Sequence, residues 1–99
     1  MSKKSKITTV IIKSETRDVK NGKCTYNLLM KESKRVASYG IPLYSVSVEL
    51  CDEFGNITTA VTKDIFSDVG KAMVFFENVV KSRATPRELP YIAEDALVH

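Results

Sequence analysis

The sequence predicts an α+β fold: a four-stranded antiparallel β-meander followed by two C-terminal α-helices packed on one face. Segments with the alternation or β-branched composition of strands extend to Lys63, and segments with helical spacing follow them. Short connections between successive strands make a meander the default order. The strands alternate instead of being apolar throughout, which indicates a sheet that is covered on one face only.

The first half of the predicted sheet is a hairpin. Ile7–Ser14 is rich in β-branched residues and forms the first predicted strand. Asp18–Lys23 contains Asn21-Gly22, a strong turn signal because both residues tolerate positive φ. Cys24–Lys31 then alternates as a second strand. The residues expected on its core face are Cys24, Tyr26, Leu28 and Met30.

The third predicted strand, Tyr39–Cys51, has the clearest alternation in the chain. Its expected core face is Tyr44, Val46, Val48 and Leu50, and its expected water face is Ser45, Ser47, Glu49 and Cys51. Pro42 lacks a backbone donor and predicts a bulge, an edge position or a late start of pairing. Asp52–Asn56 reads as a turn, and Ile57–Lys63 is the fourth strand.

The rest of the chain has helical spacing. Ser67 is the expected N-cap of a helix that runs to about Ser82, with Asp68 in its first turn. Its apolar stripe is Val69, Ala72, Met73, Phe76, Val79 and Val80, broadened by Phe75.

A second helix is predicted from Thr85-Pro86-Arg87-Glu88, which combines a capping box with proline at the first helical position. Pro90 predicts a kink or a delayed start of this helix. Its expected apolar stripe is Leu89, Ile92, Ala93, Ala96 and Leu97.

Composition indicates one globular domain. The chain has 99 residues, 43% of them hydrophobic, and a net charge of +3. We expect residues 1–6 to be a flexible basic tail and residues 7–99 to be a single α+β domain. No apolar run has the length of a membrane span or of a secretory signal, so we expect a cytoplasmic protein that does not bind membranes.

The residues that carry chemistry are few and scattered. Cys24 and Cys51 are expected to be free thiols, with Cys24 a small buried hydrophobe. With His99 at the end of the chain, they do not have the spacing of a metal site. No nucleophile motif or phosphate-binding loop occurs, so we expect neither a metal nor a cofactor and no enzymatic activity. An unrecognised carboxylate site, for example at Asp52 and Glu53, remains the enzyme hypothesis.

These exclusions leave a non-catalytic protein-interaction or regulatory module, with a homodimer as one form of it. The candidate partner-binding residues are Tyr39, Gly40, Ile41 and Tyr44, in a segment dense in aromatic and apolar groups. The competing interpretation is a loop that places Ile41 and a tyrosine in the core.

The alternative function is nucleic-acid binding by the basic N-terminal third, since residues 1–35 have a net charge of +7 and residues 36–99 a net charge of −4. The candidate residues for this function are Lys3, Lys4, Lys6, Lys13, Arg17, Lys20 and Lys23. Tyr26 could stack on bases in such a site, but it shares the apolar face of its strand, so burial is the better prediction.

Four segments together resemble a known family. They are the strand Tyr26–Glu32, the tripeptide Tyr39-Gly40-Ile41 shortly before Tyr44, the helix Asp68–Val80 and the closing segment from Pro86 to Leu97. The pattern covers roughly residues 7–97. It is similar to an uncharacterised domain of unknown function in small proteins of clostridial and related Gram-positive bacteria. Pro90 departs from this pattern. The resemblance implies the fold and a cytoplasmic location, and no activity, cofactor or site residue.

Overall fold

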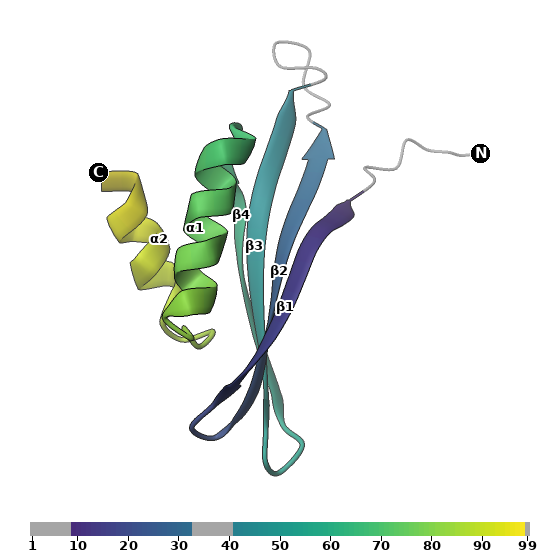
Figure 1. Cartoon of the computed structure of the whole chain (residues 1–99), viewed down its shortest axis with the longest axis vertical. Coiled ribbons are helices and arrows are strands. Elements are labelled where there is room, and N and C mark those ends of the chain that lie inside the picture. Colours follow the sequence, from purple (N-terminus) through teal and green to yellow (C-terminus); the bar gives the residue numbers. More distant parts are fainter. Residues whose placement is uncertain (1–8, 33–40, 99) are drawn as a thin grey trace, which may run out of the picture.

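A computed structural model describes residues 9–32 and 41–98. Its elements are β1 (Val10–Val19), β2 (Gly22–Glu32), β3 (Pro42–Asp52), β4 (Ile57–Phe66), α1 (Val69–Lys81) and α2 (Leu89–Val98). The strands pair antiparallel in the order β1-β2-β3-β4, and both helices lie on the same face of the sheet (Figure 1). The predicted α+β meander is confirmed. The predicted tail, residues 1–6, lies outside the described residues.

None of the described helices has the length and apolar character needed to cross a membrane.

The first hairpin is longer than the sequence pattern predicted. β1 continues to Val19, so the turn consists only of Lys20 and Asn21, and Gly22 is already paired with Val19. The polar residues from Glu15 onward were not recognised as strand because they lack β-branched apolar side chains. They are held in the sheet by pairing with β2. The core-facing side chains of β2 are in turn covered by α1.

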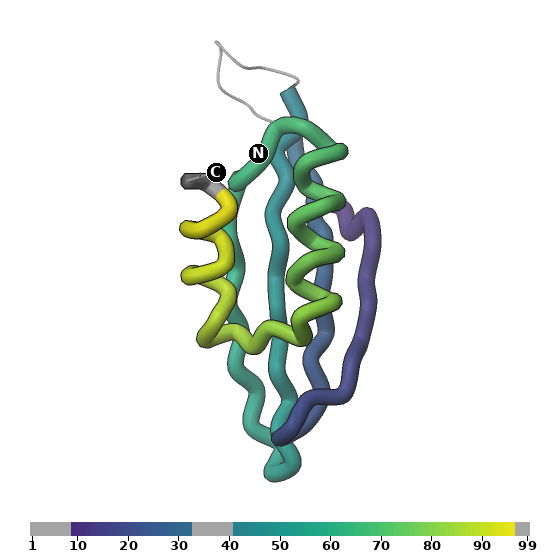
Figure 2. Tube along the Cα trace, turned by 60° about the vertical axis from the view of Figure 1, so that its left-hand side comes forward, coloured from purple at the N-terminus to yellow at the C-terminus, as the bar shows by residue number. Residues whose placement is uncertain are grey.

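The helices cover strands β2, β3 and β4 and not the edge strand β1. α1 packs mainly on β2, β3 and β4, and α2 packs mainly on β4 (Figure 2). Phe66 and Phe75 meet with ring centroids 5.5 Å apart. Edge strand β1 therefore has little helix above it. The core side chains are Cys24, Tyr26, Leu28, Tyr44, Val46, Val48, Ala72, Phe75, Phe76, Val79, Val80, Ala84, Leu89 and Ala93.

The ends of α1 differ from the prediction. Asp68, not Ser67, is the N-cap, and its Oδ1 accepts a hydrogen bond from the Gly70 N–H at 2.8 Å. Val69 is exposed and does not join the core stripe. At the other end Arg83 has φ 52°, and the Ala84 N–H bonds to the Val79 carbonyl at 3.2 Å. This closes the helix as a Schellman turn, with arginine where glycine is usual.

The second helix has the delayed start that Pro90 predicted. The Thr85 N–H donates to Glu88 Oε1 at 2.9 Å, so half of the predicted capping box forms. Residues Pro86 to Glu88 make a turn, and α2 begins only at Leu89. Ala96 is exposed, contrary to its place in the predicted stripe.

The face of β3 that points away from the helices is less exposed than predicted. Ser45 and Ser47 retain only 8% of their accessible surface each. Their small side chains lie between larger neighbours on central strands. Ser47 Oγ accepts from Asn27 Nδ2 at 3.3 Å, and Ser45 Oγ accepts from the Asp64 N–H at 2.8 Å. The expected water-facing serines are therefore buried among polar partners, although no element of residues 9–32 and 41–98 covers this face of the sheet.

Tyr26 ties the sheet to the helical layer. Its side chain is fully buried, and its hydroxyl donates to the Ala84 carbonyl at 3.0 Å. Ala84 belongs to the connection between α1 and α2, so this bond anchors that connection to β2.

Replacing Tyr26 with phenylalanine should lower the free energy of unfolding by about 1–2 kcal/mol, because the buried Ala84 carbonyl loses its donor. Thermal unfolding should show a decrease in Tm of roughly 4–15 °C. Tyr91→Phe is the matched control, since Tyr91 is 71% exposed and should tolerate the same change. Equal Tm values for the two variants would contradict this role of the hydroxyl.

Gly22 is required at the closing end of the first hairpin. A Cβ at this position would collide with the backbone carbonyl of Cys51 in β3. The absence of a side chain therefore lets β2 lie against β3 directly beside the turn. Gly55, in the turn between β3 and β4, has φ +87° and open space around it.

Gly22→Ala should destabilise the fold by about 2–3 kcal/mol, because the contacted atoms are backbone and cannot rotate away. Gly55→Ala, the control, should cost only about 1 kcal/mol, the strain of a left-handed alanine. Chemical denaturation of both variants measures the difference. A larger loss for Gly55→Ala would show that backbone conformation, and not the contact with β3, determines the need for glycine.

Candidate functional site

A row of charged side chains faces the helical layer from the edge of the sheet. Lys13, Glu15 and Arg17 alternate along β1 and pair with Leu28, Tyr26 and Cys24 of β2. Their β2 partners are buried beneath α1, whereas the charged row is only partly covered. Because α1 lies over the middle strands, long charged side chains on β1 can reach its flank and still keep their charges in water.

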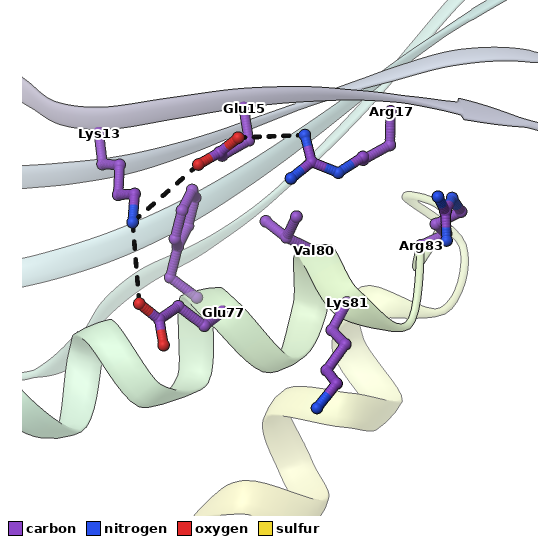
Figure 3. Close-up of a pocket in the computed structure, with 8 residues that line it drawn as sticks. Lys13, Glu15, Arg17, Glu77, Val80, Lys81 and Arg83 are labelled. Carbon is purple, nitrogen blue, oxygen red and sulfur yellow. Dashed lines mark hydrogen bonds and ion pairs between the residues drawn. The ribbon is translucent and has the colours of Figure 1, made fainter.

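The Lys13–Glu77 ion pair links the charged row to α1, and Glu15 forms ion pairs with both of its neighbours in the row (Figure 3). Lys13 Nζ lies 3.7 Å from Glu77 Oε2 of α1 and 4.0 Å from Glu15 Oε2. Arg17 Nη1 lies 3.0 Å from Glu15 Oε1 and donates to the Thr16 carbonyl at 2.9 Å. All of these side chains are partly exposed, so each pair contributes little to stability. Their effect is to order the charges along the strand.

A groove of about 330 Å³ separates β1 from α1. Its apolar lining residues are Phe76 and Val80, both of which are buried. Lys81 and Arg83 lie along the helix side and have no ion-pair partner within residues 9–32 and 41–98. Four cations and two carboxylates line the groove, which gives it a net positive charge. The lining residues are Lys13, Glu15, Arg17, Phe76, Glu77, Val80, Lys81 and Arg83.

The outer edge of β1 runs beside this groove and pairs with no other described strand. Because the turn closes on the pair Val19–Gly22, alternate residues of β1 bond to β2. The backbone groups of Ser14, Thr16 and Asp18 therefore point outward. A bulge between Ile11 and Lys13 ends this regular edge on its other side.

Two buried side chains near the groove, Cys24 and Tyr26, are not ionised near neutral pH. Burial raises the pKa of the Cys24 thiol, and it raises the pKa of the Tyr26 hydroxyl strongly. Both groups therefore stay protonated near neutral pH, so neither supplies a nucleophile or a base. No three His, Cys, Asp or Glu side chains in the described part of the chain are grouped closely enough to hold a metal ion.

A second, larger hollow of about 700 Å³ lies between the helices. Phe66, Phe75 and Val74 make it largely apolar, and Ala96 of α2 lies on its rim. Its polar lining residues, Asp68, Lys71 and Asn78, stand at the surface. The hollow lacks convergent polar groups that would orient a ligand.

The predicted partner-binding residues do not come together at the surface. Tyr39 and Gly40 lie outside the described residues. Ile41 is 43% exposed, just before β3, whereas Tyr44 is 7% exposed and belongs to the core. Tyr44 is thus unavailable to a partner, and for this residue the interpretation as a core side chain holds.

The predicted nucleic-acid-binding lysines and arginine divide into three places. Lys3, Lys4 and Lys6 lie outside the described residues. Lys13 and Arg17 line the groove in ion pairs. Lys20 is exposed in the first turn, and Lys23 beside it lies 3.6 Å from Asp18 Oδ1.

The remaining charged groove residues were not identified from the sequence. Glu15 fell beyond the predicted end of the first strand, and Glu77, Lys81 and Arg83 lie on the polar side of a helix or at its end. The available signal was the Lys13-Ser14-Glu15-Thr16-Arg17 alternation, which has the period of a strand with charge on one face.

Asp52 organises the turn between β3 and β4. Its Oδ1 accepts from the N–H groups of Asn56 and Phe54, each at 2.9 Å, and Oδ2 accepts from Asn56 Nδ2 at 3.3 Å. These bonds, that from the Asn56 backbone first, lower the pKa of the Asp52 carboxyl below its usual value. The role of Asp52 in this turn is structural.

The lowered pKa means that ionised Asp52 favours the folded state. Its contribution should be present above pH 3.8, the ordinary value, and should disappear as pH falls through the lower folded pKa. Asp52→Asn should therefore lower Tm at neutral pH, and the difference from the unmodified protein should shrink in acid. Glu53→Gln makes the same charge change next to it and should leave Tm unchanged. A pH-independent difference would refute the electrostatic explanation.

Comparison with known proteins places the whole fold, including the groove, in a single family. No curated protein and no solved structure matched the chain. Residues 5–99 match a family of unknown function, DUF6514. The match includes every described element and agrees with the resemblance to a domain of unknown function; the bacterial source stays a prediction. The chain therefore belongs to the DUF6514 family of unknown function.

Proposed function

We propose that the protein is a non-catalytic interaction module that binds an extended segment of a protein partner along the outer edge of β1. The observation that carries this proposal is the regular edge from Lys13 to Val19, which pairs on its outer side with no strand in the described part of the chain and lies beside a charged groove. An unpaired edge offers a row of backbone donors and acceptors to another strand.

Strand addition would use both features of the site. The outward backbone groups of Ser14, Thr16 and Asp18 would bond to the partner's backbone. Alternate partner side chains would point to the helix side, next to Lys13, Glu15 and Arg17. Backbone pairing would then supply affinity, and the mixed charges of the groove would select the partner sequence.

The alternative functions have less support in the geometry. Lys13, Arg17 and Lys23 each have a carboxylate partner within 4.0 Å, which reduces their attraction for phosphate. A carboxylate enzyme would need a concave site in which titratable groups meet a substrate. The groove holds two carboxylates, Glu15 and Glu77, but both are already in ion pairs with Lys13 or Arg17. Asp52 instead accepts hydrogen bonds within an exposed turn.

Thr16→Pro should abolish partner binding, because proline removes the outward N–H at the centre of the regular edge. The fold should survive, since proline is tolerated on an edge strand where the lost donor faces water. Thr16→Ala is the matched control, because it shortens the side chain and keeps the N–H. Capture of proteins from nuclease-treated cytosol, with each variant immobilised, measures the effect.

The expected result is a stoichiometric protein retained by the unmodified chain and by Thr16→Ala, and lost with Thr16→Pro. Circular dichroism and thermal unfolding check that Thr16→Pro is folded. Retention by folded Thr16→Pro would place the binding surface elsewhere. Recovery that depends on nucleic acid and falls with added salt would favour the nucleic-acid alternative.

A further inference from the structure

The β1 edge has a charge pattern that is complementary to itself. We propose that its partner strand is β1 of a second copy of this chain, paired antiparallel about a two-fold axis at Thr16. This proposal rests on the strand addition proposed above and names the partner. Closed two-fold dimers are the commonest protein oligomers, and a sheet edge that pairs with its own copy is an isologous interface.

The regular part of the edge sets the centre of the pairing. The turn at Lys20-Asn21 limits it on one side, and the bulge between Ile11 and Lys13 limits it on the other. Thr16 is the midpoint of the remaining segment, Lys13–Val19. An axis at Thr16 therefore pairs the whole regular segment with itself and leaves the bulge outside the interface.

The backbone of Thr16 has the orientation that this axis requires. Its N–H and carbonyl point outward, so the two copies of Thr16 would exchange both hydrogen bonds. Ser14 would pair in the same way with Asp18 of the second copy. The outward backbone N–H and carbonyl groups of Ser14, Thr16 and Asp18 would thus all have hydrogen-bond partners.

Side-chain charge then favours the register centred on Thr16 over the register centred on Glu15. With the axis at Thr16, Glu15 faces Arg17 of the second copy on the helix side, and the symmetric pair forms as well. With the axis at Glu15, the two Glu15 carboxylates face each other, and Lys13 faces Arg17 of the second copy. The backbone could bond in either register, so the like charges exclude the second one.

An axis at Ser14 would also bring opposite charges together, since Lys13 would face Glu15 of the second copy. It would, however, extend the pairing across the bulge, where the alternation of β1 is interrupted. Charge excludes the register centred on Glu15, and the bulge disfavours the register centred on Ser14. Thr16 is the centre that satisfies both constraints.

The opposite edge of the sheet is a poor competitor. In β4 the register with β3 shifts between Tyr44 and Val46, and Asp64 has a left-handed backbone with φ 50°. This irregularity breaks the edge, and α2 packs over β4 (Figure 2). Pairing through β1 alone gives a closed dimer and does not continue into a filament.

In the paired form the two grooves would meet. A two-fold axis perpendicular to the sheet keeps both copies of α1 on the same face, one on each side of the joined β1 strands. Arg17 already bonds to Glu15 of its own chain at 3.0 Å and has further donors available for the second copy. The interface is small, so we expect a dissociation constant on the order of micromolar.

The test is a charge swap measured by sedimentation equilibrium over a micromolar to millimolar concentration series. Glu15→Arg and Arg17→Glu each place like charges across the interface and should raise the dimer dissociation constant about tenfold or more. The double variant E15R/R17E restores opposite charges and should recover most of the dimer. Glu94→Arg makes the same charge change on the exposed surface of α2, which packs on the opposite edge strand β4, and should leave dimerisation unchanged. Circular dichroism checks the fold of each variant.

Each outcome decides between the two proposals. A chain that stays monomeric, while Thr16→Pro still abolishes capture of a different protein, would overturn the self-pairing and keep the strand-addition function. A dimer unaffected by the single charge reversals or by Thr16→Pro would place the dimer on another surface and overturn the self-pairing. If folded Thr16→Pro changed neither dimerisation nor capture, strand addition itself would be wrong.

Discussion

The hydrogen bond from Tyr26 to Ala84 is the constraint on which the arrangement of this molecule depends. It joins residues 58 positions apart and fixes the connection of the helices above β2. Next to that point α1 packs on the middle strands, where Leu28, Val46 and Val48 are buried. The aromatic ring fills the core while the hydroxyl satisfies a carbonyl that would otherwise be buried without a donor.

The position of the helices determines the chemistry of the sheet edge. A helix over β2 and β3 does not cover β1, so the helix-facing row of β1 need not be apolar. Lys13, Glu15 and Arg17 occupy it, with their charges arranged by one another and by Glu77. Edge strands are commonly protected by charges that point toward the covered face. Here the charges alternate in sign along β1. They therefore disfavour pairing with an arbitrary strand but permit pairing with a second copy of β1 in one register.

Much of the fold could be predicted from the sequence because the buried strands carry strict alternation. Tyr26, Val46 and Val48 lie where their parity places them. The pattern failed where tertiary structure overrides local preference. Polar residues 15–18 are strand because β2 pairs with them, and Ser45 is buried because larger neighbours surround it. The groove was not predictable in the same way, since its two sides, Arg17 and Lys81, are far apart in sequence and meet only through the placement of α1.

The order of the elements along the chain has a consequence for synthesis. All four strands precede both helices, so a nascent chain can complete its hairpins before α1 and α2 have left the ribosome. During that interval the apolar face of the sheet has no cover, and Tyr26 has not met the Ala84 carbonyl. Rapid synthesis of the segment after Phe66 would shorten this aggregation-prone interval, because it brings the helices onto the sheet sooner.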